Sequence, residues 1–140
     1  MTSRRQPRIL VVDDERLCLQ GMEDFLARYR LEVRSAENSA AALDVLREWE
    51  PDVLLLDIMM PEVDGITLLR RLRADIRWIG LHVIVASARA GTEDRRKALE
   101  AGANAFLTKP FTASELKAAL RMFVVLPGTA ELQSSAAAAA

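Results

Sequence analysis

The sequence is poor in cysteine and histidine, with one of each, Cys18 and His82, in 140 residues. A single cysteine cannot form an internal disulfide, and the pair cannot supply the ligands of a structural zinc site. No apolar run reaches the roughly 18 residues that a membrane-spanning helix needs. Residues 1–12 are too short and too quickly followed by acidic residues for a signal peptide. We therefore expect a cytoplasmic protein with no membrane association.

An excess of charge of either sign is also missing. Nineteen Lys and Arg residues against twenty Asp and Glu residues give a net charge of −1, so no overall basic field attracts nucleic acid. The basic clusters at residues 70–73 and 95–97 are interpreted as solvated helix faces. Neither glycine-rich phosphate-binding motif, G-x-G-x-x-G or G-x-x-x-x-G-K-[ST], occurs. The remaining composition, 51% hydrophobic and 28% charged, is typical of one globular domain.

Short apolar runs alternate with amphipathic stretches five times. The runs at residues 8–12, 31–35, 53–56, 81–86 and 105–108 predict strands, and apolar spacings of three and four between them predict helices. Strands that are apolar on both faces and are joined by helices form a parallel sheet covered on both sides. We predict an α/β fold, a flavodoxin-like (βα)5 doubly wound sheet of strand order 2-1-3-4-5. Polar alternation at residues 31–34 places that strand at an edge.

The predicted domain organisation is an N-terminal arm at 1–7, a folded domain at 8–126 and a flexible tail or linker remnant at 127–140. The tail begins with Pro127-Gly128, ends in five alanines and has no periodicity that would pack. Within the domain, Ser39, Thr92 and either Thr112 or Ser114 are candidate helix caps. Gly102 is a candidate helix stop.

Polar residues follow the predicted strands where ligands bind in this fold, at the carboxyl ends near the reversal of strand order. Asp13 and Asp14 follow the first strand, Asp57 the third, Ser87 the fourth and Lys109 the fifth. Crowded carboxylates repel unless a cation is present, and their oxygens suit Mg²⁺ (or Mn²⁺). With an ammonium and a hydroxyl beside them, they form a receptacle for a phosphoryl group, for which Asp57 is the candidate nucleophile.

Four blocks of the sequence resemble the receiver domain of two-component response regulators. They are residues 9–15 (ILVVDDE), 57–65 (DIMMPEVDG), 85–88 (VASA) and 102–111 (GANAFLTKPF), and the resemblance spans about residues 8–124. It implies a CheY-like phosphorylation-dependent switch and not a classical enzyme. Its partners would be a sensor histidine kinase or phosphotransfer protein, which donates phosphate from a phosphohistidine, and a downstream effector protein or domain.

The resemblance also implies the role of each site residue. Asp57 would accept the phosphoryl group, and Asp14, Asp57 and the backbone carbonyl of Met59 would ligate the metal, with Asp13 acting through a water. Lys109 would pair with a phosphoryl oxygen, and its bond to Pro110 would be cis. Ser87 would donate to the phosphoryl group and move toward it. Phe106 would change rotamer when Ser87 moves.

The phosphorylation state would be transmitted by the face of the fourth helix, fifth strand and fifth helix, about residues 92–123. Regulators that dimerise through this face to drive a DNA-binding domain often carry Asp-Asp-Tyr where this chain has Asn104-Ala105-Phe106. A monomer and a phosphorylation-linked dimer therefore both stay open, and we expect no direct contact of this domain with nucleic acid.

Two alternatives compete with the switch. A haloacid-dehalogenase-like phosphatase also combines a strand-end Asp with a Ser and a Lys, but residues 13–15 lack its Asp-x-Asp motif. A receiver-like binding module would no longer take phosphate. Some residues have sufficient structural explanations: Pro61 stiffens a loop, Gly65 suits a position of positive φ, and Cys18 is a small packed side chain.

Overall fold

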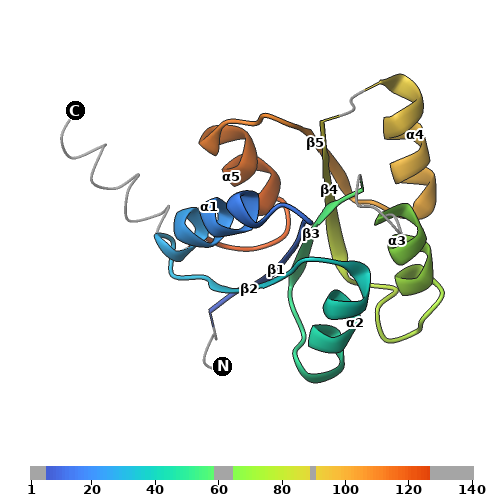
Figure 1. The fold of residues 1–140 in the computed structure, drawn as a ribbon, viewed down its shortest axis with the longest axis horizontal. Coiled ribbons are helices and arrows are strands. Elements are labelled where there is room, and N and C mark those ends of the chain that lie inside the picture. Colours follow the sequence, from blue (N-terminus) through green and yellow to red (C-terminus); the bar gives the residue numbers. More distant parts are fainter. Residues whose placement is uncertain (1–5, 59–64, 89–90, 127–140) are drawn as a thin grey trace.

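The computed structural model describes residues 6–58, 65–88 and 91–126 as alternating strands and helices (Figure 1). The alternation confirms the predicted element types, and three of the five strands are displaced or extended by one residue. The elements are β1 (Arg8–Val12), α1 (Arg16–Ala27), β2 (Glu32–Ala36), α2 (Ser39–Glu48), β3 (Val53–Asp57), α3 (Gly65–Arg73), β4 (His82–Ser87), α4 (Thr92–Ala101), β5 (Ala105–Thr108) and α5 (Ala113–Arg121). None of these helices is long and apolar enough to cross a bilayer.

The five strands form one parallel sheet in the order β2-β1-β3-β4-β5, as predicted. The edge strand β2 is mostly half-buried, whereas every residue of the central strand β3 is buried. In the register, Val12 lies beside Leu56 and Ser87 beside Thr108. The residues that follow these strand ends therefore emerge at one edge of the sheet.

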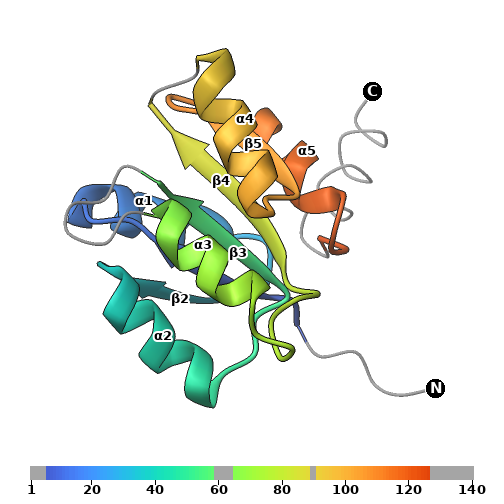
Figure 2. The ribbon, with the colours of Figure 1, turned by 90° about the vertical axis from the view of Figure 1, so that its right-hand side faces the viewer.

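The helices cover both faces of the sheet, with α1 and α5 on one side and α2, α3 and α4 on the other (Figures 1 and 2). Alternate residues of each central strand enter separate cores because successive side chains point to opposite faces. Leu10, Leu54 and Val83 pack toward α2, α3 and α4. Ile9, Leu55 and Ile84 pack toward α1 and α5. Both faces are thus closed, and the strand ends remain as the surface on which a site can form.

The helix ends have local causes. Thr112 and Glu115 form a capping box at the start of α5, and Gly102 ends α4 with a φ of 116°, both as predicted. The predictions for Ser39 and Thr92 were wrong by one residue. Each is the first helical residue, and the extended residue before it is the N-cap: Asn38 at α2, whose side chain accepts from the amide of Ala41, and Gly91 at α4.

Candidate functional site

Three carboxylates meet at the carboxyl ends of the neighbouring strands β1 and β3. Asp13 and Asp14 follow β1, Asp57 closes β3, and carboxylate oxygens of the three lie within 4.8 Å of one another. Asp13 and Asp57 are 5% and 7% exposed, whereas Asp14 is exposed. The structure therefore brings together three residues that are 44 positions or less apart in sequence by placing β1 beside β3.

Backbone hydrogen bonds fix Asp13. Its amide donates to the carbonyl of Ala36 at 3.1 Å, and its carboxylate Oδ1 accepts from the amide of Glu15 at 3.0 Å. The second bond is the short-range type that an Asp side chain forms with the backbone two residues later, and it turns the chain from β1 into α1. The other oxygen, Oδ2, is thereby directed to Lys109.

Gly65 positions Asp57 from the other side. A Cβ at Gly65 would lie 2.6 Å from Ile58 Cα and 2.7 Å from the carbonyl oxygen of Asp57. The first residue of α3 therefore lies directly against the backbone at the end of β3. The predicted reason for this glycine was wrong, since Gly102 is the one glycine with positive φ among the described residues. Close approach of two backbones, not φ, requires Gly65.

Lys109 joins the carboxylates. Its Nζ donates to Asp13 Oδ2 at 2.6 Å and to Asp57 Oδ2 at 3.4 Å. Its amide donates to the carbonyl of Ser87 at 2.8 Å, and the Lys109–Pro110 bond is cis, as the resemblance implied. Burial by itself lowers the pKa of Lys109, but the bond to Asp13 and the charges of both aspartates outweigh it, and the pKa is raised. Lys109 is therefore a stable cation at neutral pH.

Ser87 and Phe106 lie on the adjacent strands β4 and β5. Ser87 is fully buried at the end of β4, and Phe106 is partly buried in the middle of β5. The predicted site residue Met59, the loop residue Pro61 and residues 89–90 lie outside the described part of the chain. Sequence reasoning missed Arg95 of α4, whose guanidinium lies 4.9 Å from the centroid of the Phe106 ring.

The donor set suits a divalent cation. One ammonium can balance only one of three carboxylates, and Asp13 and Asp57 are shielded from water. Carboxylate oxygens at this spacing match the preference of Mg²⁺ for hard ligands. The cluster of Asp13, Asp14 and Asp57 therefore fits a Mg²⁺ site.

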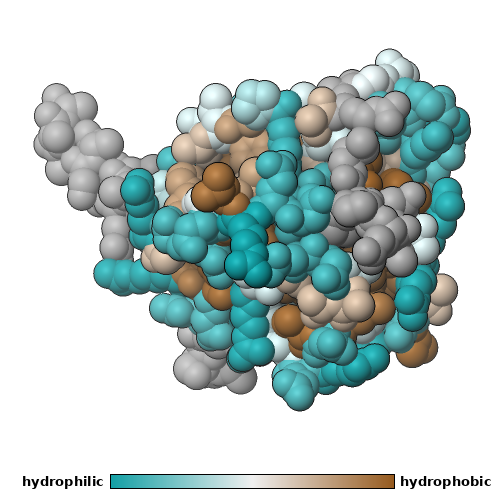
Figure 3. All heavy atoms as spheres, in the orientation of Figure 1, coloured by the Kyte–Doolittle hydropathy of each residue, from teal (hydrophilic) through white to brown (hydrophobic). Residues whose placement is uncertain are grey.

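An apolar groove between α1 and α5 opens onto the same site. It has a volume of about 570 Å³ and is lined mainly by apolar side chains, among them Leu17, Phe25 and Phe111, and it reaches Asp13 and Lys109. Brown, hydrophobic atoms are visible where these helices lie (Figure 3). Cys18 also lines the groove, and its pKa is raised by burial and by the charge of Asp13. The groove was not foreseen because its walls are distant in sequence.

The chain matches the family model for the response regulator receiver domain over residues 9–121. It is 39% identical over 134 residues to the transcriptional regulatory protein PrrA of Mycobacterium tuberculosis, covering 96% of this chain and 57% of the relative. It is also 39% identical over 114 residues to the response regulator MprA of Mycobacterium avium, covering 81% of this chain and 49% of the relative. The chain thus spans about half the length of these curated relatives.

Solved receiver structures have the same fold. The receiver domain of Francisella response regulator 1452 superposes with a TM-score of 0.77 at 32% identity, covering 84% of this chain and 95% of that one. A response regulator structure from Chloroflexus aurantiacus gives a TM-score of 0.79 at 31% identity, covering 84% and 96%. Vibrio cholerae CheY4 gives 0.81 at 22% identity, covering 86% and 100%, which shows the fold alone.

The chain belongs to the response regulator receiver domain family. This family consists of regulatory phosphoacceptors of two-component systems and not of classical enzymes, so the alternative of a haloacid-dehalogenase-like phosphatase is wrong. Membership implies a cognate sensor kinase. The cluster of Asp13, Asp14 and Asp57 beside Lys109 is typical of the Mg²⁺ site of receivers and is consistent with a phospho-aspartate switch.

Proposed function

We propose that this domain is a Mg²⁺-dependent (or Mn²⁺-dependent) switch that takes a phosphoryl group onto Asp57 from a phosphohistidine of its kinase or of a phosphotransfer protein. One observation supports this assignment above all. Asp57 closes the central strand β3, is 7% exposed, lies 3.4 Å from Lys109 and shares a cation-sized cluster with Asp13 and Asp14. It is thus the carboxylate that the other charged groups surround.

In the proposed transfer, a carboxylate oxygen of Asp57 attacks phosphorus while the P–N bond of the phosphohistidine breaks. The electron pair of that bond leaves with the imidazole. A bound metal supplies charge neutralisation for the phosphoryl oxygens, which is the main requirement of this chemistry. Asp14, Asp57 and the Met59 carbonyl would hold it directly, and Asp13 would act through a water.

Lys109 and Ser87 would stabilise the product. The ammonium of Lys109 already lies between Asp13 and Asp57, so a phosphoryl oxygen on Asp57 gains a charge-assisted bond. Phosphorylation adds about −1.5 to −2 charges and three acceptor oxygens. Ser87 would donate its hydroxyl to one of them, and Phe106 would change rotamer in response. The added bonds favour one of two existing conformations, so the switch is a population shift.

The phosphorylation state would be transmitted by the surface of α4, β5 and α5 to a partner or output domain. The matched region covers 57% of the relative named a transcriptional regulatory protein and 49% of the one named a response regulator. We propose a domain at residues 8–126 that acts as a monomer or a phosphorylation-linked dimer in the cytoplasm and does not itself bind nucleic acid. Size-exclusion chromatography with light scattering, before and after phosphorylation, separates the two assembly states.

Incubation with acetyl phosphate and Mg²⁺ tests the proposal. Intact-mass spectrometry should show a gain of one phosphoryl group that disappears in Asp57→Asn and after chelation of the metal. Asp44→Asn is the matched control, because Asp44 is an exposed carboxylate on α2 paired with Arg47. The absence of labelling in the wild-type protein, together with no affinity for Mg²⁺, would support a binding module without phosphorylation instead. Unchanged labelling in Asp57→Asn would refute Asp57 as the acceptor.

Lys109 has a separate test. Lys109→Ala should leave the fold intact, as judged by circular dichroism, but interrupt the response of the α4, β5 and α5 surface to labelling. Amide chemical shifts of α4, before and after phosphorylation, measure that response. A response equal to that of the wild-type protein would reject the role of Lys109.

A further inference from the structure

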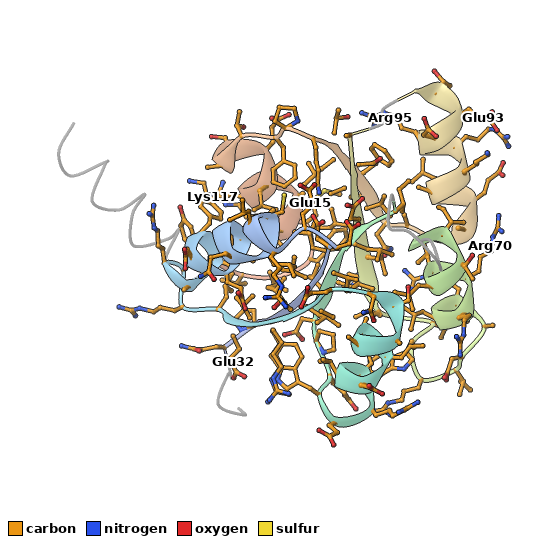
Figure 4. All side chains as sticks on the ribbon, in the orientation of Figure 1. Glu15, Glu32, Arg70, Glu93, Arg95 and Lys117 are labelled. Carbon is orange, nitrogen blue, oxygen red and sulfur yellow. The ribbon has the colours of Figure 1, made fainter. Side chains whose placement is uncertain are left out.

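A cation from α4 covers the ring of Phe106. The guanidinium of Arg95 lies 4.9 Å from the ring centroid, and its Nη2 lies 3.5 Å from Thr108 Oγ1. Phe106 and Thr108 are two residues apart on β5, so their side chains project from the same face of the sheet. That face is the one on which α4 packs. Arg95 lies on the side of α4 toward β5 (Figure 4).

Of the two residues under Arg95, Thr108 is the neighbour of Ser87 in the sheet. In the register of β4 and β5, Val85 lies beside Phe106 and Ser87 beside Thr108. Ser87 is fully buried, Phe106 is partly buried and Arg95 is exposed. Val85 and Ser87 are two residues apart on β4, so the Phe106 ring and the Ser87 side chain lie on the same face of the sheet. In the proposed switch, a change of the Phe106 rotamer toward Ser87 would move the ring away from the guanidinium of Arg95.

The position of Arg95 on α4 has no explanation within the helix. Arg95 is the fourth residue of α4, near an N-terminus where the helix dipole disfavours a cation. The next residue, Arg96, forms ion pairs with Glu93 and Glu100 of the same helix. The guanidinium of Arg95, in contrast, contacts Phe106 and Thr108 of β5.

We propose that Arg95 is a positioning residue that holds Phe106 in its observed rotamer and so favours the unphosphorylated conformation of the domain. This inference rests on the proposed function of Asp57, Ser87 and Phe106. An exposed cation–π contact corresponds to a change of about two- to fivefold in an equilibrium constant. Removing the guanidinium therefore multiplies the population of the alternative conformation by this factor, and phosphorylation, which favours that conformation, becomes faster.

The experiment measures the initial rate of phosphorylation by acetyl phosphate and Mg²⁺. Arg95→Ala should be about two- to fivefold faster than the wild-type protein, and Arg95→Lys, which keeps a cation near the ring, should fall between them. Arg96→Ala is the matched control, because it removes the same charge from the adjacent position of α4. In a Phe106→Leu background, Arg95→Ala should have no further effect, since the ring through which it acts is absent.

A second measurement needs no phosphorylation. Urea unfolding of the wild-type protein, Arg95→Ala, Phe106→Leu and the double variant should show that the two single effects are not additive. Additive effects overturn the inference, as do equal rates in Arg95→Ala and Arg96→Ala or an undiminished effect in the Phe106→Leu background. If the wild-type protein is not labelled on Asp57, the proposed function fails and the inference with it. If the wild-type protein is labelled on Asp57 and Arg95→Ala does not change the rate of labelling, only the proposed role of Arg95 is refuted.

Discussion

Replacing Arg73 by alanine should destabilise the domain more than the loss of any other arginine on α3. Its guanidinium lies at the end of α3 and joins two loops that are distant in sequence. Nε and Nη2 donate to the carbonyl of Gly102 at 3.0 and 2.8 Å, and Nη1 donates to the carbonyl of Trp78 at 3.0 Å. Nη2 also donates to Asn104 Oδ1 at 2.9 Å. Because the guanidinium is partly withdrawn from water, burial lowers the pKa of Arg73.

The magnitude follows from the bonds that are lost. A hydrogen bond from a charged donor contributes about 1.5–3 kcal/mol, and a carbonyl left unsatisfied costs about 1–3 kcal/mol. Because Arg73 is only half-buried and its bonds share acceptors, these terms do not add in full. We expect Arg73→Ala to lower the free energy of unfolding by about 2–4 kcal/mol. Arg73→Lys should recover less than half of this, since one ammonium cannot reach both loops.

Urea denaturation followed by circular dichroism measures this loss, with Arg71→Ala as the control. Arg71 is an exposed arginine on the same helix, and its removal should change stability by less than about 0.5 kcal/mol. Gly102→Ala provides a second test of the contact. A Cβ at residue 102 would lie 2.6 Å from Arg73 Cγ, and Gly102 has a φ of 116°. The cost of Gly102→Ala should be smaller in the Arg73→Ala background, where the contact is absent. If Arg73→Ala matches Arg71→Ala, the reasoning about the two loops is wrong.

Three other predictions follow from the site and its surroundings. Gly65→Ala should cost about 1–3 kcal/mol and prevent acetyl phosphate labelling, because the new Cβ displaces the backbone of Asp57; normal labelling would contradict this. Thr112→Ala should lower the free energy of unfolding by about 1 kcal/mol through loss of the capping box, as urea melts can check. Since burial and Asp13 raise the pKa of Cys18, alkylation of this thiol should begin at higher pH than in a free cysteine, and Asp13→Asn should lower that pH. An unshifted profile in Asp13→Asn would contradict the assigned cause.

The sequence alone predicted the strand order and the convergence of the charged residues. Both follow from local patterns: apolar runs that are too uniform for an amphipathic strand must be buried on both faces, and parallel strands bring their carboxyl ends to one edge. The proximity of Asp13 and Asp57 could be predicted from these patterns alone. The same reasoning placed Lys109 beside them, because its strand ends at the same edge of the sheet. The resemblance to receivers added the roles of these residues.

The tertiary structure decided what depends on contacts between elements. Gly65 looked like a turn glycine, but the close approach of α3 to the end of β3 is what excludes a side chain there. Arg73 and Arg95 looked like solvated arginines, yet one bonds the carbonyl that ends α4 and the other covers a ring on β5. A helical pattern shows which residues lie outside the buried face of their helix. It does not show which neighbouring loop or strand lies within reach of a long side chain. That distance is set by how the helices pack on the sheet, and only the assembled fold contains it.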